Sequence, residues 1–88
     1  MIFMKEFIFT VNDPDGIHAR PAGLLVKEAN KYSSQIIIKL NDKTADAKKI
    51  FSVMGLAAKK SDNLQISICG DDEDLAAENL ETFLKNNM

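Results

Sequence analysis

The chain contains a single histidine, His18, in a short segment whose residue types could together bind and transfer an anion. Gly16 lets the backbone bend just before the imidazole, and Pro21 fits the first turn of a helix that follows it. We therefore expect His18 at a helix N-terminus, where backbone N–H groups without helical partners and the aligned peptide dipoles favour an anion. Arg20 adds a permanently charged, planar group that can hold phosphoryl oxygens through paired hydrogen bonds. The segment predicts a site at which His18 is the phosphoryl-accepting nucleophile and Arg20 holds the charge.

Simpler explanations exist for each of these residues. A lone histidine in a small protein is more often a surface residue or a helix cap than a nucleophile, and an exposed arginine often forms an ion pair of little consequence. The phosphoryl-accepting site is favoured because glycine, arginine and proline all bear on anion binding at one point. One histidine and one distant cysteine, Cys69, cannot supply the three or four ligands of a metal site, so we expect no metal. The chain lacks a glycine-rich phosphate loop of the Walker type, and we expect no cofactor.

The composition is typical of a small folded protein. The 88 residues suffice for one modest core, so we expect a single domain spanning residues 1–88. Hydrophobic residues make up 45% of the chain and charged residues 27%, which argues against disorder. The net charge of −2, from 11 basic and 13 acidic side chains, does not provide the concentrated basic surface that nucleic-acid backbones require. We therefore expect no nucleic-acid partner.

Two features of the sequence favour a cytoplasmic location. Cys69 cannot form an intramolecular disulfide, and it lies in an alternating apolar run where cysteine acts as a small hydrophobic residue. The apolar residues 1–4 are followed at once by Lys5 and Glu6, and they are far too few for a signal-peptide core or a membrane span. We expect a cytoplasmic protein that does not insert into a membrane.

The hydrophobic pattern alternates along the chain between a period of two, which predicts strands, and a period of about 3.6, which predicts helices. Strands are predicted at residues 7–11, 36–40, 45–47 and 64–68, and helices at 22–29 (ending near 30–34), 50–57 and 76–84. Asn41 and Asp42 suit the tight turn of a hairpin. The resulting order is βαββαβα. We expect an α+β fold, a two-layer open-faced β-sandwich with three helices on one face of a four-stranded antiparallel sheet.

An acidic run, residues 71–74, follows Gly70 and precedes the last predicted helix. Negative charge at a helix start is favourable because it opposes the positive end of the peptide dipoles. A calcium loop would need oxygen ligands at fixed spacings with a glycine in the middle. We therefore expect this run to cap the helix and otherwise to form a solvated face.

These features resemble a known family, the histidine-containing phosphocarrier proteins (HPr) of the bacterial phosphoenolpyruvate-dependent sugar phosphotransferase system. The resemblance covers nearly the whole chain, including segments 16–22, 27–32, 41–44 and 48–54. It implies the same kind of fold. It also implies a phosphoryl carrier rather than an enzyme, in which His18 attacks, through Nδ1, a phosphoryl group held on a histidine of the first enzyme of the system. The carrier then donates that group to sugar-specific acceptor proteins.

Ile50, Phe51 and Met54 form a large apolar group on a short predicted helix. Core packing accounts for part of Ile50, but three such residues exceed what one buried stripe needs, so we expect some to be exposed as a docking surface. In the resembling family this helix lies beside the active histidine. The resemblance therefore implies Arg20, Gly23, Ile50, Phe51 and Met54 as partner-binding residues.

One position departs from the family. In many relatives, particularly those of low-GC Gram-positive bacteria, a dedicated kinase phosphorylates a serine at the start of the second helix, and Lys49 stands there in this chain. We expect that regulation to be absent and predict no regulatory phosphoserine. Ser52 lies three residues away, about one helical turn, and does not inherit the role. Ala57 and Ser61 stand where relatives often have glycine.

Two other functions stay open. One is a phosphocarrier whose acceptors are transcription factors, metabolic enzymes or a dedicated relay branch rather than sugar uptake, which Lys49 favours. The other is an interaction domain that keeps the fold without transferring phosphate, which the intact His18 and Arg20 disfavour. We expect a monomer, because a small carrier must offer one face to successive partners.

Overall fold

The computed structural model describes residues 4–88, so the apolar start of the chain lies, apart from Met4, outside the described residues. Within this range the chain forms four strands and three helices in the predicted order. They are β1 (Lys5–Thr10), α1 (Ala19–Ala29), β2 (Gln35–Leu40), β3 (Lys43–Asp46), α2 (Ile50–Met54), β4 (Asn63–Cys69) and α3 (Glu73–Asn87). Over the described residues, none of the helices has the length and apolarity that crossing a membrane requires.

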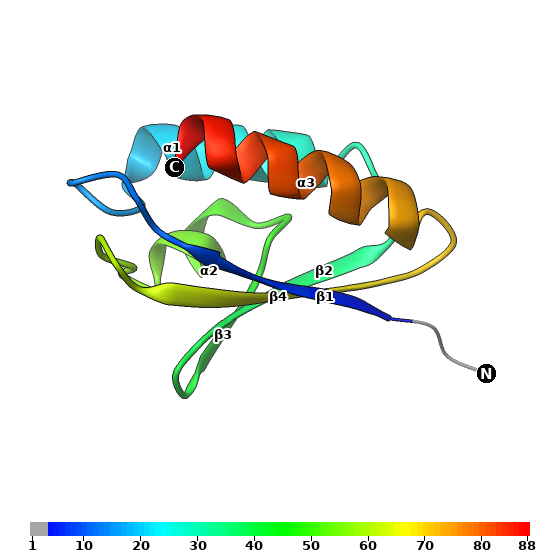
Figure 1. The fold of residues 1–88 in the computed structure, drawn as a ribbon, viewed down its shortest axis with the longest axis horizontal. Helices are drawn as coiled ribbons and strands as arrows, with labels where there is room; N and C mark the ends of the chain where they lie inside the picture. The colour runs from blue at the N-terminus through cyan, green and yellow to red at the C-terminus, as the bar shows by residue number, and fades with distance from the viewer. Residues whose placement is uncertain (1–3) are drawn as a thin grey trace.

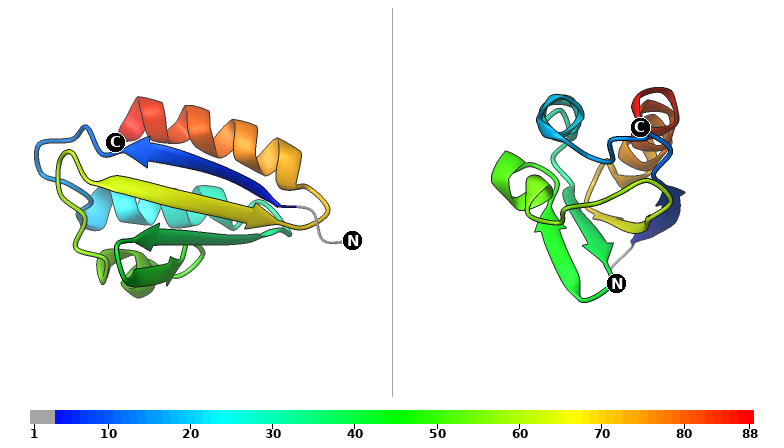
Figure 2. Two further views of the ribbon diagram at one scale, coloured as in Figure 1. Left: turned by 60° about the horizontal axis from the view of Figure 1, so that its bottom comes forward. Right: turned by 90° about the vertical axis from the view of Figure 1, so that its left-hand side faces the viewer.

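The strands found in residues 4–88 form one antiparallel sheet in the order β1, β4, β2, β3. Ile66 of β4 pairs with Phe7 of β1 on one side and with Ile38 of β2 on the other, and Ile38 pairs in turn with Ala45 of β3. Side chains opposite one another in a sheet share a face, so these residues form one apolar surface. All three helices cover that surface and leave the other face open (Figures 1 and 2). The predicted open-faced sandwich is confirmed.

The core lies between the sheet and its helices. Its fully buried large side chains are Val11, Leu25, Ile36, Ile38, Val53, Leu64, Ile66, Ile68, Leu80 and Leu84. Burying a side chain of this size contributes roughly 1.5–3 kcal/mol relative to leaving it exposed. A helix as short as α2 is not stable alone in water, so its conformation depends on packing of Val53 against this core.

The second helix is shorter than the apolar spacing predicts. The pattern continues to Ala57, but α2 ends at Met54 and Gly55 follows as its C-terminal cap. Ala57 has a φ of 51° and Ser61 a φ of 77°, both in the left-handed region. Glycine enters that region without a Cβ clash, so both residues hold a backbone conformation that costs a residue with a Cβ more than it would cost glycine.

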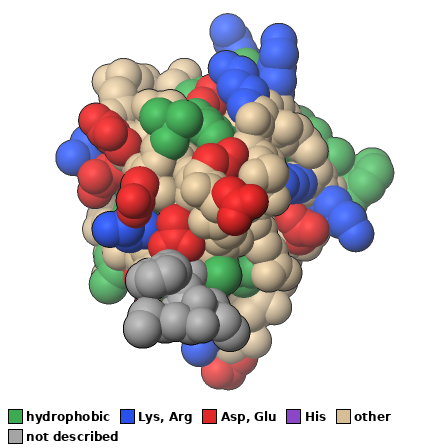
Figure 3. Space-filling view, turned by 90° about the vertical axis from the view of Figure 1, so that its right-hand side faces the viewer, with side chains coloured by type: hydrophobic (Ala, Val, Ile, Leu, Met, Phe, Trp, Pro, Cys, Tyr) green, Lys and Arg blue, Asp and Glu red, His purple; other side chains and the backbone are tan. Residues whose placement is uncertain are grey.

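The acidic run before α3 is more involved in the fold than the sequence predicts. Asp72 occupies the N-cap position, but its carboxylate accepts hydrogen bonds from the backbone N–H groups of Ser33 and Ser34, both at 2.9 Å, and from the Ser34 hydroxyl. Glu73 is buried and accepts a hydrogen bond from the N–H of Gly70 at 3.2 Å. Acidic side chains do gather at this end of the molecule (Figure 3). The acidic residues stand at the start of α3 as expected, but the expectation of a solvated face is wrong for Asp72 and Glu73, because their carboxylates bind backbone N–H groups of neighbouring turns.

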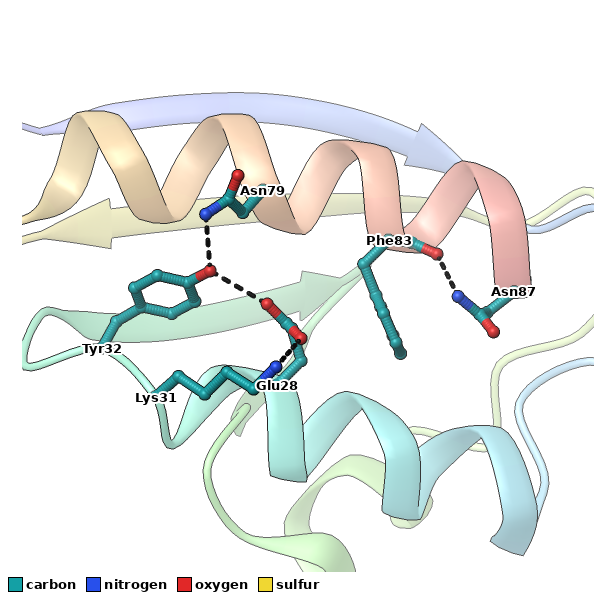
Figure 4. Close-up of polar contacts among 6 residues, drawn as sticks. All are labelled: Glu28, Lys31, Tyr32, Asn79, Phe83 and Asn87. Atoms are coloured by element: carbon teal, nitrogen blue, oxygen red, sulfur yellow. Dashed lines mark hydrogen bonds and ion pairs between the residues drawn. The ribbon is translucent and has the colours of Figure 1, made fainter.

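A polar bridge joins the C-terminal end of α1 to α3. The Tyr32 hydroxyl donates to Oε2 of Glu28 at 2.9 Å and accepts from Nδ2 of Asn79 at 2.9 Å (Figure 4). Nζ of Lys31 lies 3.0 Å from Oε1 of Glu28, and this hydrogen bond is the main cause that lowers the pKa of Glu28. Burial raises the pKa of the Tyr32 hydroxyl. The bridge holds the two helices side by side above the sheet.

Replacing Ser61 by glycine should stabilise the protein. The left-handed backbone costs a residue with a Cβ roughly 1–2 kcal/mol, and the greater freedom of glycine in the unfolded chain cancels part of the gain, so we expect an increase of up to about 1 kcal/mol. Chemical denaturation followed by circular dichroism measures this free energy of unfolding. Ser61→Ala keeps the Cβ and is the matched control. An equal gain in both variants would show that the backbone conformation is not the source.

Asp72 should make stability depend on pH in acid. Hydrogen bonds from Ser34 and Ser33 hold the pKa of Asp72 below its usual value in the folded protein. The stabilisation is therefore complete above the pKa of the unfolded chain and is lost as the pH falls through the lower folded value. Asp72→Asn should reduce the loss of stability between about pH 6 and about pH 3, measured by urea unfolding. Asp71→Asn is the control for loss of one charge at this end, and an equal effect in both variants would contradict the assignment.

Candidate functional site

His18 lies immediately before α1, at its N-cap position, with an extended backbone (φ −109°, ψ −174°). Its main-chain oxygen accepts a helical hydrogen bond from the N–H of Ala22 at 2.9 Å. The imidazole makes no capping hydrogen bond with the helix, and the side chain is 46% exposed. The ring is thus accessible to a partner, and it stands beside first-turn amides that have no acceptor within the helix. The predicted position of His18 at a helix N-terminus is confirmed.

The loop that delivers His18 is packed against the segment that follows α2. Gly16 has a φ of 70°, and a Cβ at this position would lie 2.2 Å from the main-chain oxygen of Ala58. The same oxygen accepts a hydrogen bond from the N–H of Ile17 at 3.0 Å, and the Ile17 side chain is buried. Both the left-handed backbone and the close approach require glycine. The bend predicted at Gly16 therefore also fixes the loop to a distant part of the chain.

Asp13 is the neighbour of His18 that the sequence analysis did not identify. Its Oδ2 lies 3.9 Å from Nε2 of His18, and its Oδ1 accepts a hydrogen bond from the N–H of Asp15 at 2.8 Å. Side-chain ligand atoms of Asp13, Asp15 and His18 all lie within 4.8 Å of one another. In the sequence the two aspartates read only as loop-forming residues. The only signal in the sequence that could have linked them to His18 is their closeness, five and three residues before the histidine.

His18 and Arg20 share an open depression. Its lining residues are Asp13, His18, Arg20, Pro21, Leu24, Asn86 and Asn87. The two asparagines come from the end of α3, so the C-terminal helix forms one wall of the site. Nδ2 of Asn87 donates to the main-chain oxygen of Phe83 at 2.8 Å, a bond within α3 that orients the Asn87 side chain (Figure 4). Arg20 is exposed in the first turn of α1, where its guanidinium can reach an anion held on His18.

An apolar surface lies on α2 and the adjoining turn of α1. Phe51 is 85% exposed and Met54 37%, as the sequence predicts for a docking surface, whereas Ile50 is partly buried against the core. Leu24, 42% exposed, extends this surface to the depression beside His18, and the sequence analysis did not single it out. A Cβ at Gly23 would lie 3.7 Å from Cδ1 of Ile50, an ordinary contact distance, so Gly23 lies where α1 meets α2 and has room for a small side chain.

The start of α2 carries lysines whose roles differ. Lys49 is the N-cap residue, and its side chain makes no capping hydrogen bond. Nζ of Lys48 donates to the main-chain oxygen of Tyr32 at 2.6 Å and ties this turn to the end of α1. The hydroxyl of Ser52 accepts a hydrogen bond from the N–H of Asp46 at 2.9 Å, and so it joins α2 to β3.

Comparison with known proteins gives concordant matches over most of the chain. A protein-family model described as the PTS HPr component phosphorylation site matches residues 5–86. The phosphocarrier protein HPr of Lysinibacillus sphaericus is 47% identical over 81 residues, which are 92% of each chain. The HPr of Buchnera aphidicola subsp. Baizongia pistaciae is 45% identical over 83 residues, 94% of this chain and 95% of the relative. A solved structure of the histidine-containing phosphocarrier protein from Mycoplasma has a TM-score of 0.90 at 36% identity, covering 93% of both chains.

Gly16→Ala should destabilise the protein by more than the roughly 1–2 kcal/mol that a left-handed backbone alone costs, because the new Cβ also overlaps the main-chain oxygen of Ala58. Urea unfolding measures the loss. Gly23→Ala is the matched control, since its Cβ meets only the end of the Ile50 side chain and alanine favours a helix by up to about 1 kcal/mol. A Gly16→Ala variant as stable as wild type would disprove the packing described for this loop.

Proposed function

Because this chain belongs to the HPr family of phosphocarrier proteins, we propose that His18 accepts a phosphoryl group from the first, phosphoenolpyruvate-dependent enzyme of the phosphotransferase system and passes it to sugar-specific acceptor proteins. As an HPr, the chain is a carrier and not a catalyst of its own reaction. His18 is the nucleophile in this proposal, and Arg20 holds the transferred charge.

The observation that supports this assignment best is the position of the imidazole. His18 is half-exposed at the N-cap of α1, without a capping hydrogen bond, and shares a surface depression with Arg20. A histidine that only capped the helix would use its ring to satisfy first-turn amides. Here those amides and the guanidinium are left for an anion.

For the transfer, the carrier has to position the imidazole and to stabilise the charge on the phosphoryl group, and little else. A ring nitrogen of the neutral imidazole attacks the phosphorus atom, while the bond between phosphorus and the donor nitrogen breaks. Charge on the phosphoryl oxygens is met by the first-turn N–H groups and by Arg20. The donor enzyme, which covers the exposed site during transfer, excludes water from it.

The apolar surface beside the site gives successive partners a place to dock. Phe51, Met54 and Leu24 are the exposed part of this surface, and Ile50 and Gly23 support it from within the contact between α1 and α2. Apolar residues rimmed by polar ones are typical of protein interfaces. A monomer in the cytoplasm fits this role, because one face must engage the donor and then the acceptors.

A second candidate is a carrier that serves regulatory acceptors rather than sugar uptake. Lys49 at the usual position of the regulatory serine favours it, and Ser52 offers no substitute because its hydroxyl accepts a hydrogen bond from Asp46. The two candidates differ only in the acceptors. Mixing the phosphorylated protein with sugar-specific components and measuring loss of the phosphoryl group separates them.

Incubation with phosphoenolpyruvate and the first enzyme of the system should add one phosphoryl group to the chain. Intact-mass spectrometry should show the gain, and the adduct should be lost in acid, as phosphohistidine is. His18→Ala should abolish it. Arg20→Ala should slow its formation by about 100-fold, the order expected when one preorganised donor to a developing anion is removed.

Arg20→Lys is the matched control for this experiment. It keeps a positive charge without the planar pair of donors and should recover part of the lost rate. Absence of any adduct with a donor enzyme from the same organism would overturn the carrier assignment and favour an interaction domain.

A further inference from the structure

Asp13 is held more firmly than an exposed loop residue needs to be. Its N–H donates to the main-chain oxygen of Met88 at 2.7 Å, and its main-chain oxygen accepts from the N–H of Gly16 at 2.9 Å. Its Oδ1 accepts from the N–H of Asp15 at 2.8 Å. These bonds fix both the backbone and one carboxylate oxygen, and the side chain is only 27% exposed. The second oxygen, Oδ2, is therefore presented in a defined direction.

That direction is toward His18. Oδ2 lies 3.9 Å from Nε2 of the imidazole, so a small rotation of the half-exposed ring brings the pair to hydrogen-bond distance. An ionised carboxylate can only accept a hydrogen bond, whereas a neutral imidazole carries hydrogen on one of its two nitrogens. A carboxylate facing Nε2 favours hydrogen on that atom and leaves the lone pair on Nδ1.

We propose that Asp13 is a positioning residue that holds His18 in the tautomer with hydrogen on Nε2 and thereby directs the phosphoryl group to Nδ1. The inference rests on the proposed carrier function and adds the reason for the choice of nitrogen. Elsewhere in protein chemistry, a carboxylate hydrogen-bonded to a histidine likewise orients the ring and fixes its tautomer.

The transfer step then needs no movement of a proton. The Nδ1 lone pair forms the new bond to phosphorus, and the bond from phosphorus to the donor histidine breaks, its electron pair remaining on the donor nitrogen. Nε2 keeps its hydrogen throughout. The ring gains positive charge as the bond forms, and the Asp13 carboxylate faces the edge of the ring that bears this charge, away from the incoming phosphoryl oxygens.

Asp13→Asn is the decisive variant because it should reverse the tautomer. The asparagine oxygen can still accept from the N–H of Asp15, which places the amide NH₂ where Oδ2 stood. An NH₂ group donates, so the facing Nε2 would become the acceptor and hydrogen would move to Nδ1. Asp13→Ala removes the carboxylate without imposing the opposite tautomer. Asp15→Asn removes the neighbouring charge of the same cluster and is the matched control.

The test has two readouts on the full chain. Imidazole ¹⁵N chemical shifts, followed as the pH is raised until they no longer change, identify the nitrogen that carries hydrogen in the neutral ring. We expect hydrogen on Nε2 in the wild type and in Asp15→Asn, and a shift toward Nδ1 in Asp13→Asn. The phosphorylation rate with phosphoenolpyruvate and the first enzyme should fall by about tenfold in Asp13→Asn, the lower end of what partners orienting a histidine contribute. Asp13→Ala should lose less than Asp13→Asn.

Each outcome decides one claim. The role of Asp13 is overturned if Asp13→Asn keeps the wild-type tautomer or the wild-type rate. It is also overturned if Asp13→Ala and Asp13→Asn slow the phosphorylation equally, because the loss of negative charge would then account for the effect. Backbone amide spectra of each variant separate these results from loss of the fold. If the wild type accepts no phosphoryl group, the carrier function fails, while the ¹⁵N shifts still decide whether Asp13 sets the tautomer.

Discussion

The junction between β1 and α1 is the constraint on which the rest of the structure depends. The role proposed for His18 requires an imidazole that is exposed and yet rigidly placed, although loops of exposed polar residues are ordinarily the most mobile part of a protein. This junction is fixed by main-chain hydrogen bonds that join Val11 to Asp62, Ile17 to Ala58 and Asn12 to Met88. Segments from the middle and the end of the chain therefore meet at the residues around His18. Because these bonds use backbone atoms, they position the segment around His18 without involving the imidazole or the Arg20 guanidinium.

The candidate site is an open depression on the surface and not an enclosed cavity. A chain of 88 residues buries one core, here between the sheet and the three helices of the described residues, and little remains to build walls around a ligand. The imidazole and Arg20 therefore lie in an open depression, with Phe51 and Met54 exposed on the next helix. A protein that hands on a group to a partner gains from this arrangement, since the partner completes the enclosure.

Much of the fold could be predicted because hydrophobic periodicity reports which face of an element is buried. The alternation of Ile36 and Ile38 and the helical spacing of Leu80 and Leu84 identified elements that the structure contains. Boundaries were less predictable. The apolar spacing continued to Ala57, but α2 ends at Met54 because the chain turns there through a left-handed segment to reach β4. Periodicity records burial, and a residue can be apolar and near the core without being helical.

The acidic run before α3 and the loop before His18 show a second limit of prediction from sequence. Aspartate is a common residue of helix caps and turns, so the sequence around Asp72 and Asp13 predicts a cap or a turn with side chains in solvent. In the structure the Asp72 carboxylate binds the turn at Ser33 and Ser34, and Asp13 faces His18 while its backbone is bonded to Met88. Side-chain oxygens of this type bind whichever N–H groups the fold brings near. The partners of the Asp72 carboxylate are distant in sequence, and the backbone of Asp13 is fixed by Met88 at the other end of the chain, so neither arrangement follows from neighbouring residues alone.

The sequence by itself determined the place of His18 before a helix and the order of the elements, because glycine, proline and apolar spacing act on their immediate neighbours. The tertiary structure decided the order of the strands, the contribution of Asn86 and Asn87 to the wall of the site, and the pairing of the Asp13 carboxylate with Nε2 of His18. These depend on contacts between segments up to about the length of the chain apart, and such contacts follow from the joint packing of the core rather than from any short stretch of residues.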